Sequence, residues 1–114
     1  NLFIVSGPGS PSVLTNVPVQ IEQHVEWITK CIKFLENNKR QSIESTNVAA
    51  NKWQKEIMNS VKKTLFMKAK SSWYKGDNIP GKSKSFLPYP GGMPKYRKAC
   101  LKVEKTNYKE LKIT

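Results

Sequence analysis

Three stretches of the chain carry hydrophobic residues at helical spacing, near residues 18–37, 46–65 and 94–105. The first stretch follows Asn16, a favourable helix N-cap, and has Pro18 in its first turn. Its apolar positions recur at i, i+4, i+7, i+11 and i+14, so they share one helix face: Ile21, Val25, Ile28, Ile32 and Leu35. Three further residues widen this face until we expect the helix to pack on two sides: Trp27, Cys31 and Phe34.

The second and third stretches predict shorter helices. Ser45 or Thr46 can cap the second helix. The buried side of that helix is expected to carry Trp53, Ile57, Val61 and Leu65. The third helix, from about Pro94 to Lys105, turns four residues to one side: Tyr96, Ala99, Cys100 and Val103.

Two other stretches predict β-strands. Leu2–Val5 is a continuous apolar run, which is typical of a strand buried on both faces, and Tyr108–Ile113 alternates weakly. Such a buried strand needs neighbours on both sides, and this chain offers few. The pattern therefore predicts a mostly α chain with short β-strands that is part of a larger α/β protein.

Glycine, proline and serine break the helical pattern between residues 66 and 93. Loops of this length in compact proteins usually serve as lids or are disordered. Trp73 and Tyr74 are large side chains for such a loop, and they favour a binding role. The chain thus divides into a strand and loop (1–17), two helices (18–65), a lid-like loop (66–93) and a terminal helix and strand (94–114).

Basic residues dominate the charge of the chain, with 20 Lys and Arg against 8 Asp and Glu and a formal net charge of +12. All 20 basic residues lie from Lys30 onward. Such a surface attracts nucleic acid, anionic membranes or phosphate-bearing ligands. It can also be an ordinary solvated surface, or it can face an acidic part of the protein outside this chain.

Neither a membrane span nor a signal peptide is expected, because no apolar run is long enough and the N-terminus lacks a basic start. Cys31 and Cys100 lie far apart without a zinc-site spacing, so we expect two reduced, buried thiols. Together these features predict a cytoplasmic protein without a metal site.

Catalytic groups are scarce. His24 is the only histidine and Asp77 the only aspartate, so no nucleophilic triad can be assembled. On a helix rich in apolar residues, His24 is expected to be a hydrogen-bonded structural residue. Glu22 and Glu26 are expected to make a solvated or inter-domain contact rather than an acid–base pair.

The stretch Gly7–Asn16 links the predicted strand Leu2–Val5 to the first helix. A helix that starts at such a loop directs free N–H groups and the positive end of its dipole at whatever lies above it. That arrangement suits an anion or a polarised carbonyl, but many Gly/Pro loops only turn the chain. The loop is not a dinucleotide fingerprint, because Ser12 stands where the third glycine is required.

Nearly the whole chain resembles the C-terminal part of Baeyer–Villiger monooxygenases of the phenylacetone and cyclohexanone monooxygenase type. The resemblance is carried first by residues 1–12 and 21–27. It continues in the family's order through residues 64–66, 72–74, 78–82, 89, 91–92 and 96–97. The family's fold combines two dinucleotide-binding domains with a helical insertion. Its members use FAD, NADPH and O2 to insert an oxygen atom beside a ketone carbonyl.

The resemblance also implies roles for individual residues. Leu2–Val5 would be a strand that returns to the FAD domain, and the loop after it would lie beside the flavin. The residues of this flavin-side loop would be Gly9, Ser12, Val13, Leu14, Thr15 and Asn16. Trp73 would lie on a mobile loop that closes over NADP, where Lys75 and Lys82 could add positive charge near the phosphates.

The family's Gly-rich nucleotide fingerprints and its active-site arginine are not in this chain. We therefore expect the chain alone to hold no catalytic residue, to bind neither FAD nor NADP(H), and to need the family's N-terminal FAD and NADP domains as partners. Two further expectations concern assembly and an alternative function. Leu2–Val5 is expected to pair with a second copy or to pack beneath the helices of its own chain. The alternative function is a small basic binding module for nucleic acid or an acidic protein.

Overall fold

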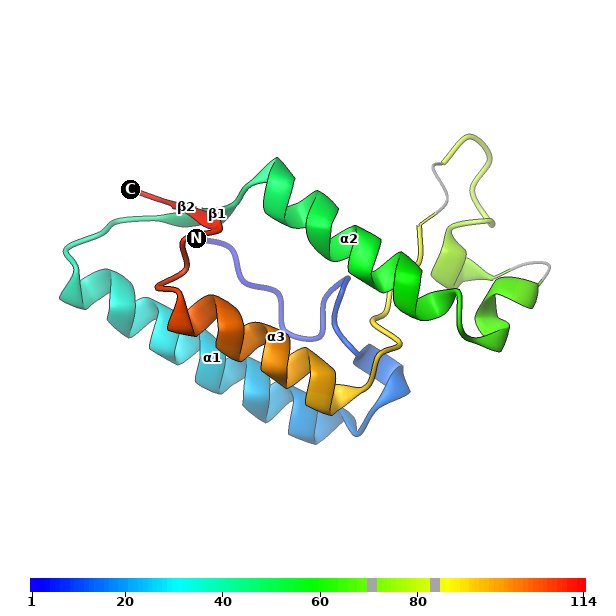
Figure 1. Ribbon diagram of the computed structural model, residues 1–114, viewed down its shortest axis with the longest axis horizontal. Helices are drawn as coiled ribbons and strands as arrows, with labels where there is room; N and C mark the ends of the chain where they lie inside the picture. The colour runs from blue at the N-terminus through cyan, green and yellow to red at the C-terminus, as the bar shows by residue number, and fades with distance from the viewer. Residues whose placement is uncertain (70–71, 83–84) are drawn as a thin grey trace.

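Helix caps set the architecture of this computed structural model, which describes residues 1–69, 72–82 and 85–114 (Figure 1). In these residues the chain forms α1 (Val17–Asn37), α2 (Asn47–Val61) and α3 (Met93–Lys105). Strands β1 (Ile43–Ser45) and β2 (Leu111–Ile113) pair antiparallel. The mostly helical fold with short strands is confirmed. None of the helices in the described ranges is both long enough and apolar enough to cross a membrane.

The helices α1 and α2 begin at residues that the sequence identifies as N-caps. The Asn16 side chain accepts a hydrogen bond from the Val19 N–H at 3.3 Å, as an N-cap should. Thr46, rather than Ser45, caps α2 by accepting from the Ala49 N–H at 3.1 Å. Its hydroxyl also donates to the Glu110 carbonyl at 3.1 Å, which ties the start of α2 to the end of the chain.

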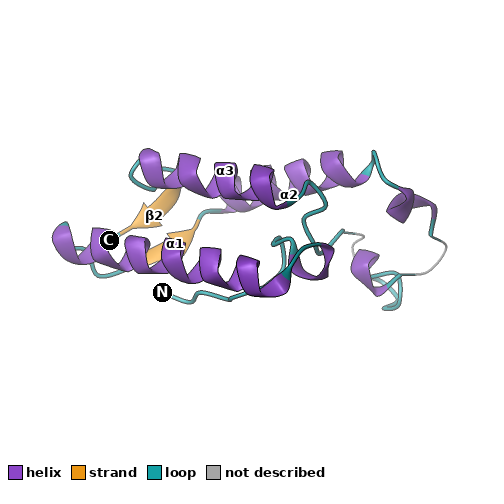
Figure 2. Ribbon diagram, turned by 90° about the horizontal axis from the view of Figure 1, so that it is seen from below, coloured by secondary structure: helices purple, strands orange, loops and turns teal. Residues whose placement is uncertain are grey.

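The helices lie around the N-terminal segment. Figure 1 shows this segment passing between α2 on one side and α1 with α3 on the other. The indole N–H of Trp27 on α1 donates to the Cys100 carbonyl on α3 at 3.1 Å, so these two helices pack together. Figure 2 shows the short sheet at one end of the molecule and short turns at the other. Those turns are η1 (Ser12–Leu14), η2 (Leu65–Lys68) and η3 (Trp73–Lys75).

Buried hydrophobic side chains form two clusters. The first lies near the sheet and contains Cys31, Leu35, Ile43 and Tyr108. The second lies between α2 and the loops and contains Ile57, Val61, Phe86 and Tyr89. Both cysteines are free thiols, Cys31 buried and Cys100 partly buried. The second cluster also packs against Leu14 of the Gly7–Asn16 loop and against Phe66 and Tyr74 of the 66–93 loop.

The predicted strand Leu2–Val5 does not form. Leu2 is 85% exposed and Ile4 63%, and only Phe3 packs against a core. Asn1 pairs with Ile43, whose N–H donates to the Asn1 Oδ1 at 2.9 Å, but the following residues have no ladder. The prediction was wrong for this chain, because a strand needs a neighbouring edge along its length and this segment meets β1 only at Asn1.

The predicted apolar face of α1 is also mostly uncovered. Ile21, Val25 and Ile32 are between 39% and 51% exposed. The buried residues of α1 are Gln20, Gln23, His24, Cys31 and Leu35. The helix therefore packs on one side rather than two, and the rest of this chain approaches its more polar side.

Two smaller expectations fail at the ends of elements. Leu65 lies beyond α2 in the η2 turn and is 77% exposed, because the helix ends at Val61. Tyr108 is buried but does not begin a strand. Its φ of 56° places it in a left-handed turn, and β2 starts only at Leu111.

Candidate functional site

The flavin-side loop turns sharply at Gly9. Its φ is 83°, a left-handed conformation that glycine adopts without strain. A Cβ atom at this position would lie 2.9 Å from Nε1 of Trp53 on α2. The same indole nitrogen donates to the Gly9 carbonyl at 2.9 Å. The close approach of loop and indole thus requires glycine here.

Side chains of α1 hold the beginning of this loop. The Ser6 N–H donates to Nδ1 of His24 at 3.1 Å, and Nε2 of Gln20 donates to the Ser6 hydroxyl at 2.8 Å. Ser10 donates its hydroxyl to the Gly7 carbonyl at 2.7 Å. Burial lowers the pKa of His24, which favours the neutral ring whose Nδ1 can accept. The expected structural role of His24 is confirmed.

Leu87 joins the flavin-side loop to the turn that carries Trp73. Its carbonyl accepts from the Gly9 N–H at 2.7 Å, while its own N–H donates to the Tyr74 carbonyl at 2.9 Å. Two residues later, the Tyr89 N–H donates to the Ser10 carbonyl at 2.7 Å. The backbone therefore connects the two predicted parts of the site directly.

Trp73 and Ser12 line the same cavity. This cavity has a volume of about 180 Å³, and its walls are Ser6, Gly7, Pro8, Ser12, Trp73, Tyr74, Leu87 and Pro88. The Trp73 ring is 60% exposed and lies against Tyr74, with ring centroids 4.0 Å apart. The structure thus brings together one residue from each of the two predicted regions, although about half of the chain separates them.

The other predicted residues have different surroundings. Leu14 packs against the second cluster, Val13 is 58% exposed, and Asn16 is used as the cap of α1. Thr15, at the C-terminal end of η1, donates its N–H to the Ser12 carbonyl at 3.3 Å. These four residues surround the start of α1 rather than the cavity.

The two lysines of the lid-like loop differ in their partners. Lys75 lies 2.9 Å from a carboxylate oxygen of Asp77 and donates to the Ala69 carbonyl at 2.6 Å. The Lys75 and Asp77 side chains are only 16% and 13% exposed, so this charge already stabilises the turn. Lys82 is exposed and its stem lies beside Gly76. Residues 70–71 and 83–84 of this loop lie outside the described residues.

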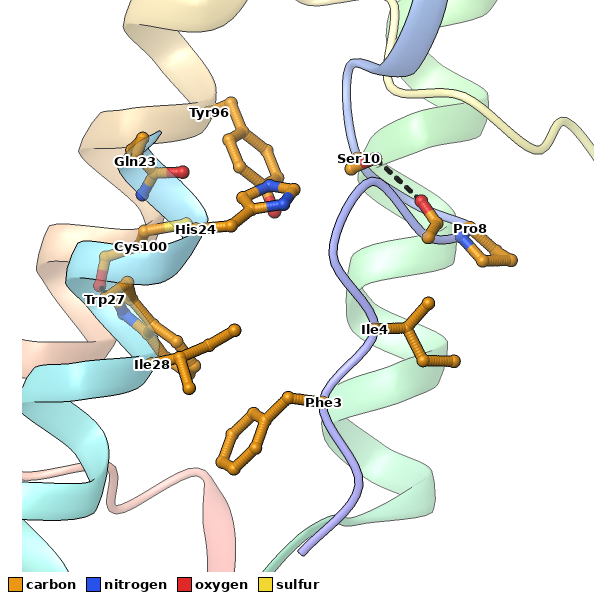
Figure 3. Close-up of a pocket in the computed structure, with 11 residues that line it drawn as sticks. Phe3, Ile4, Pro8, Ser10, Gln23, His24, Trp27, Ile28, Tyr96 and Cys100 are labelled. Atoms are coloured by element: carbon orange, nitrogen blue, oxygen red, sulfur yellow. Dashed lines mark hydrogen bonds between the residues drawn. The ribbon is translucent and has the colours of Figure 1, made fainter. Parts of the chain in front are cut away.

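A second cavity of about 170 Å³ lies behind the flavin-side loop (Figure 3). Side chains of α1 and α3, among them His24 and Tyr96, face the N-terminal residues Phe3 and Ile4 across it. Burial raises the pKa values of Tyr96 and of the Cys100 thiol, so both stay protonated at neutral pH. Within the part of the chain that the structure describes, no three His, Cys, Asp or Glu side chains gather into a metal site.

Sequence reasoning missed the residues that hold the site together. Gln20 is fully buried, and Tyr89 is 2% exposed and stacked on Trp53 with ring centroids 4.9 Å apart. One signal for Gln20 was available, because it lies four residues before His24 and shares its helix face. Leu87 acts through its backbone, for which the sequence carries no signal.

Comparison with known proteins agrees with the resemblance seen in the sequence. No protein-family model matches the chain. The chain is 43% identical over 97 residues to a cyclohexanone 1,2-monooxygenase of Acinetobacter sp, covering 85% of this chain and 17% of that protein. It is 39% identical over 111 residues to a Baeyer–Villiger monooxygenase of Pseudooceanicola batsensis, covering 97% of this chain and 20% of that protein.

The fold gives the same result. A closed crystal structure of cyclohexanone monooxygenase matches with a TM-score of 0.85 and 38% identity over 98% of this chain and 20% of that one. A steroid monooxygenase bound to NADP matches with a TM-score of 0.85 and 34% identity over 97% and 20%. The chain thus spans about a fifth of the length of these relatives. By sequence and by fold, it belongs to the Baeyer–Villiger monooxygenases and corresponds to a segment of such a protein.

Proposed function

We propose that this chain is the C-terminal part of a cytoplasmic FAD- and NADPH-dependent monooxygenase that inserts oxygen next to a ketone carbonyl. When bound, the flavin would supply the oxygen-transfer chemistry. The residues of this chain would position the reactants, with the Gly7–Asn16 loop beside the flavin and Trp73 over the nicotinamide nucleotide. The observation that carries the proposal is the shared cavity of Ser12 and Trp73, with Leu87 bonded to both loops.

The surface of the flavin-side loop fits a flat aromatic cofactor. Val13 and Val17 are 58% and 38% exposed, and they present apolar atoms at the start of α1. The positive end of the α1 dipole lies at the same place and would stabilise negative charge on a reduced ring. The loop behind these residues is held by Gln20, His24 and Trp53, so it would not have to be ordered by the cofactor.

The exposed apolar residues provide a surface on which other domains of the whole protein can pack. Ile21, Val25 and Ile32 on α1 and Leu2 and Ile4 in the N-terminal segment are all at least 39% exposed. Large contiguous apolar surfaces on a folded protein usually mark an interface. We therefore propose that N-terminal FAD and NADP domains of the whole protein cover these residues, since this chain matches only about a fifth of the relatives' length.

A chimera tests the proposal. The matching segment of the Acinetobacter cyclohexanone monooxygenase is replaced by residues 1–114, and bound FAD and cyclohexanone-dependent NADPH oxidation are measured. The chimera should bind FAD and turn over. The chain alone should do neither, because the nucleotide fingerprints are missing.

Two variants of the chimera test the site itself. Trp73→Ala should slow turnover without lowering the FAD content, and Ser12→Leu should do the same by filling the cavity. Lys63→Gln, at an exposed position after α2 and outside the cavity, is the control that should leave turnover unchanged. Turnover by the isolated chain, or a FAD-loaded chimera that tolerates both Trp73→Ala and Ser12→Leu, would overturn the proposal.

A further inference from the structure

Four lysines form a line along one flank of α3. Lys95, Lys98, Lys102 and Lys105 are all exposed and recur at i, i+3, i+7 and i+10. At 100° and 1.5 Å per residue, they fall within an arc of about 80° and span about 15 Å along the helix. We call these four residues the lysine flank.

The lysine flank borders a groove of about 540 Å³. The other residues of its lining are mostly uncharged: Trp53, Tyr89, Ala99, Leu101 and Thr106, together with Glu56. Glu56 is the only carboxylate in that lining. The groove therefore combines four positive charges with a largely apolar floor.

Two other carboxylates near α3 pair with lysines outside the flank. Glu104 lies on the opposite flank of α3 and pairs with Lys30 at 3.4 Å. Glu110 pairs with Lys52 at 2.5 Å, although Lys102 also contributes to lowering its pKa. Among the ion pairs found in the described residues, none includes a lysine of the flank. The flank thus has positive charge available for an external anion.

We propose that the lysine flank and its groove bind an acidic segment of another protein. Adjacent lysines are three or four residues apart, which places their Cβ atoms about 5–6 Å from each other, a spacing that carboxylates on a helix or strand can match. Long-lived interfaces are more apolar than this surface, whereas a rim of exposed lysines gives a salt-dependent, transient contact. The uncovered face of α1 is on a different helix and remains free for the domains proposed above.

The groove is less suited to single-stranded nucleic acid. Proteins that bind such strands stack bases on exposed aromatic rings. Trp53 and Tyr89 are stacked on each other at an interplanar angle of 24°, and Tyr89 is 2% exposed. The rings of the groove are therefore already occupied, and a phosphodiester chain would gain only charge.

Fluorescence anisotropy of a labelled glutamate-rich peptide tests the inference on the 114-residue chain. The peptide should bind, and its affinity should fall as salt is added. Replacing all four flank lysines by glutamine should weaken binding at least about tenfold, since four exposed ion pairs of ordinary strength multiply to that factor. An oligothymidylate of equal charge should bind more weakly than the peptide.

A matched control removes the same net charge elsewhere. Lys33, Lys55, Lys62 and Lys63 are exposed and outside the groove, so their replacement by glutamine should leave peptide binding within about threefold of the original. Circular dichroism establishes that both variants are folded. Equal losses in the two variants would show attraction by net charge alone and overturn the inference, as would preference for the oligothymidylate or no binding to the unaltered chain.

Discussion

Gly9→Ala should be the most informative single substitution in the flavin-side loop. A left-handed conformation costs a residue with a Cβ atom about 1 kcal/mol. At Gly9 the new atom would also lie 2.9 Å from Nε1 and 3.2 Å from Cδ1 of Trp53. Because Trp53 is stacked on Tyr89, the indole cannot move away without losing that contact and its hydrogen bond to the Gly9 carbonyl.

The expected cost follows from these contacts. The hydrogen bond contributes about 1 kcal/mol and the aromatic pair about 0.5–1 kcal/mol, so the total for Gly9→Ala is about 2–3 kcal/mol. For a chain of this size, that corresponds to a Tm about 10 °C lower. Gly81→Ala is the matched control, because its φ is 77° but no atom of the described residues lies within 4 Å of the added Cβ.

Thermal unfolding followed by circular dichroism measures both variants. Gly81→Ala should lower the free energy of unfolding by about 1 kcal/mol, from backbone strain alone. The difference between the two variants then isolates the contact with Trp53. Equal Tm values for Gly9→Ala and Gly81→Ala would refute the view that the indole fixes this loop.

Three further substitutions test the charges and the N-terminal segment. Burial lowers the pKa of His24 from 6.5, so the unfolded chain takes up a proton on His24 at a higher pH than the folded chain does. The free energy of unfolding should therefore fall as the pH drops below about 6.5. Urea unfolding at several pH values should show this slope for the unaltered chain and not for His24→Gln. Asp77→Asn breaks a largely buried ion pair with Lys75 and should lower the free energy of unfolding by about 2 kcal/mol. Hydrogen exchange in the η3 turn should become faster, and unchanged exchange would contradict a role for the pair there. Exposed Leu2 and Ile4 should cause concentration-dependent association, seen by analytical ultracentrifugation and abolished by replacing both with lysine; a monomer at all concentrations would exclude it.

Local chemistry made the helices predictable. Asn16 and Thr46 each satisfy an N–H group only three residues away, and Pro18 fits the first helical turn whatever packs against it. Such interactions lie within one segment of sequence, so the starts of α1 and α2 could be located from the residues alone. The ends of elements depend more on distant contacts, which is why Leu65 was placed in α2.

The candidate site could be predicted only in part. Ser12 and Trp73 were identified through the resemblance, but nothing in their spacing indicates that they line one cavity. Their meeting depends on Leu87, which acts through its N–H and carbonyl groups. Every residue except proline has both groups, so a backbone link of this kind has no signature in the sequence.

The pattern of burial on α1 favours a contact between this helix and a surface outside the chain. Hydrophobic spacing places Ile21, Val25 and Ile32 on one face, and an isolated domain would be expected to bury that face. The chain instead buries Gln20 and His24, whose hydrogen bonds to Ser6 offset part of the cost of removing them from water. The face of α1 that carries Gln20 and His24 therefore holds the loop. The exposed apolar face is the one on which we expect a second surface to pack. Substituting Ile21 and Val25 by serine should leave the stability of the chain nearly unchanged but weaken its assembly with the proposed FAD and NADP domains.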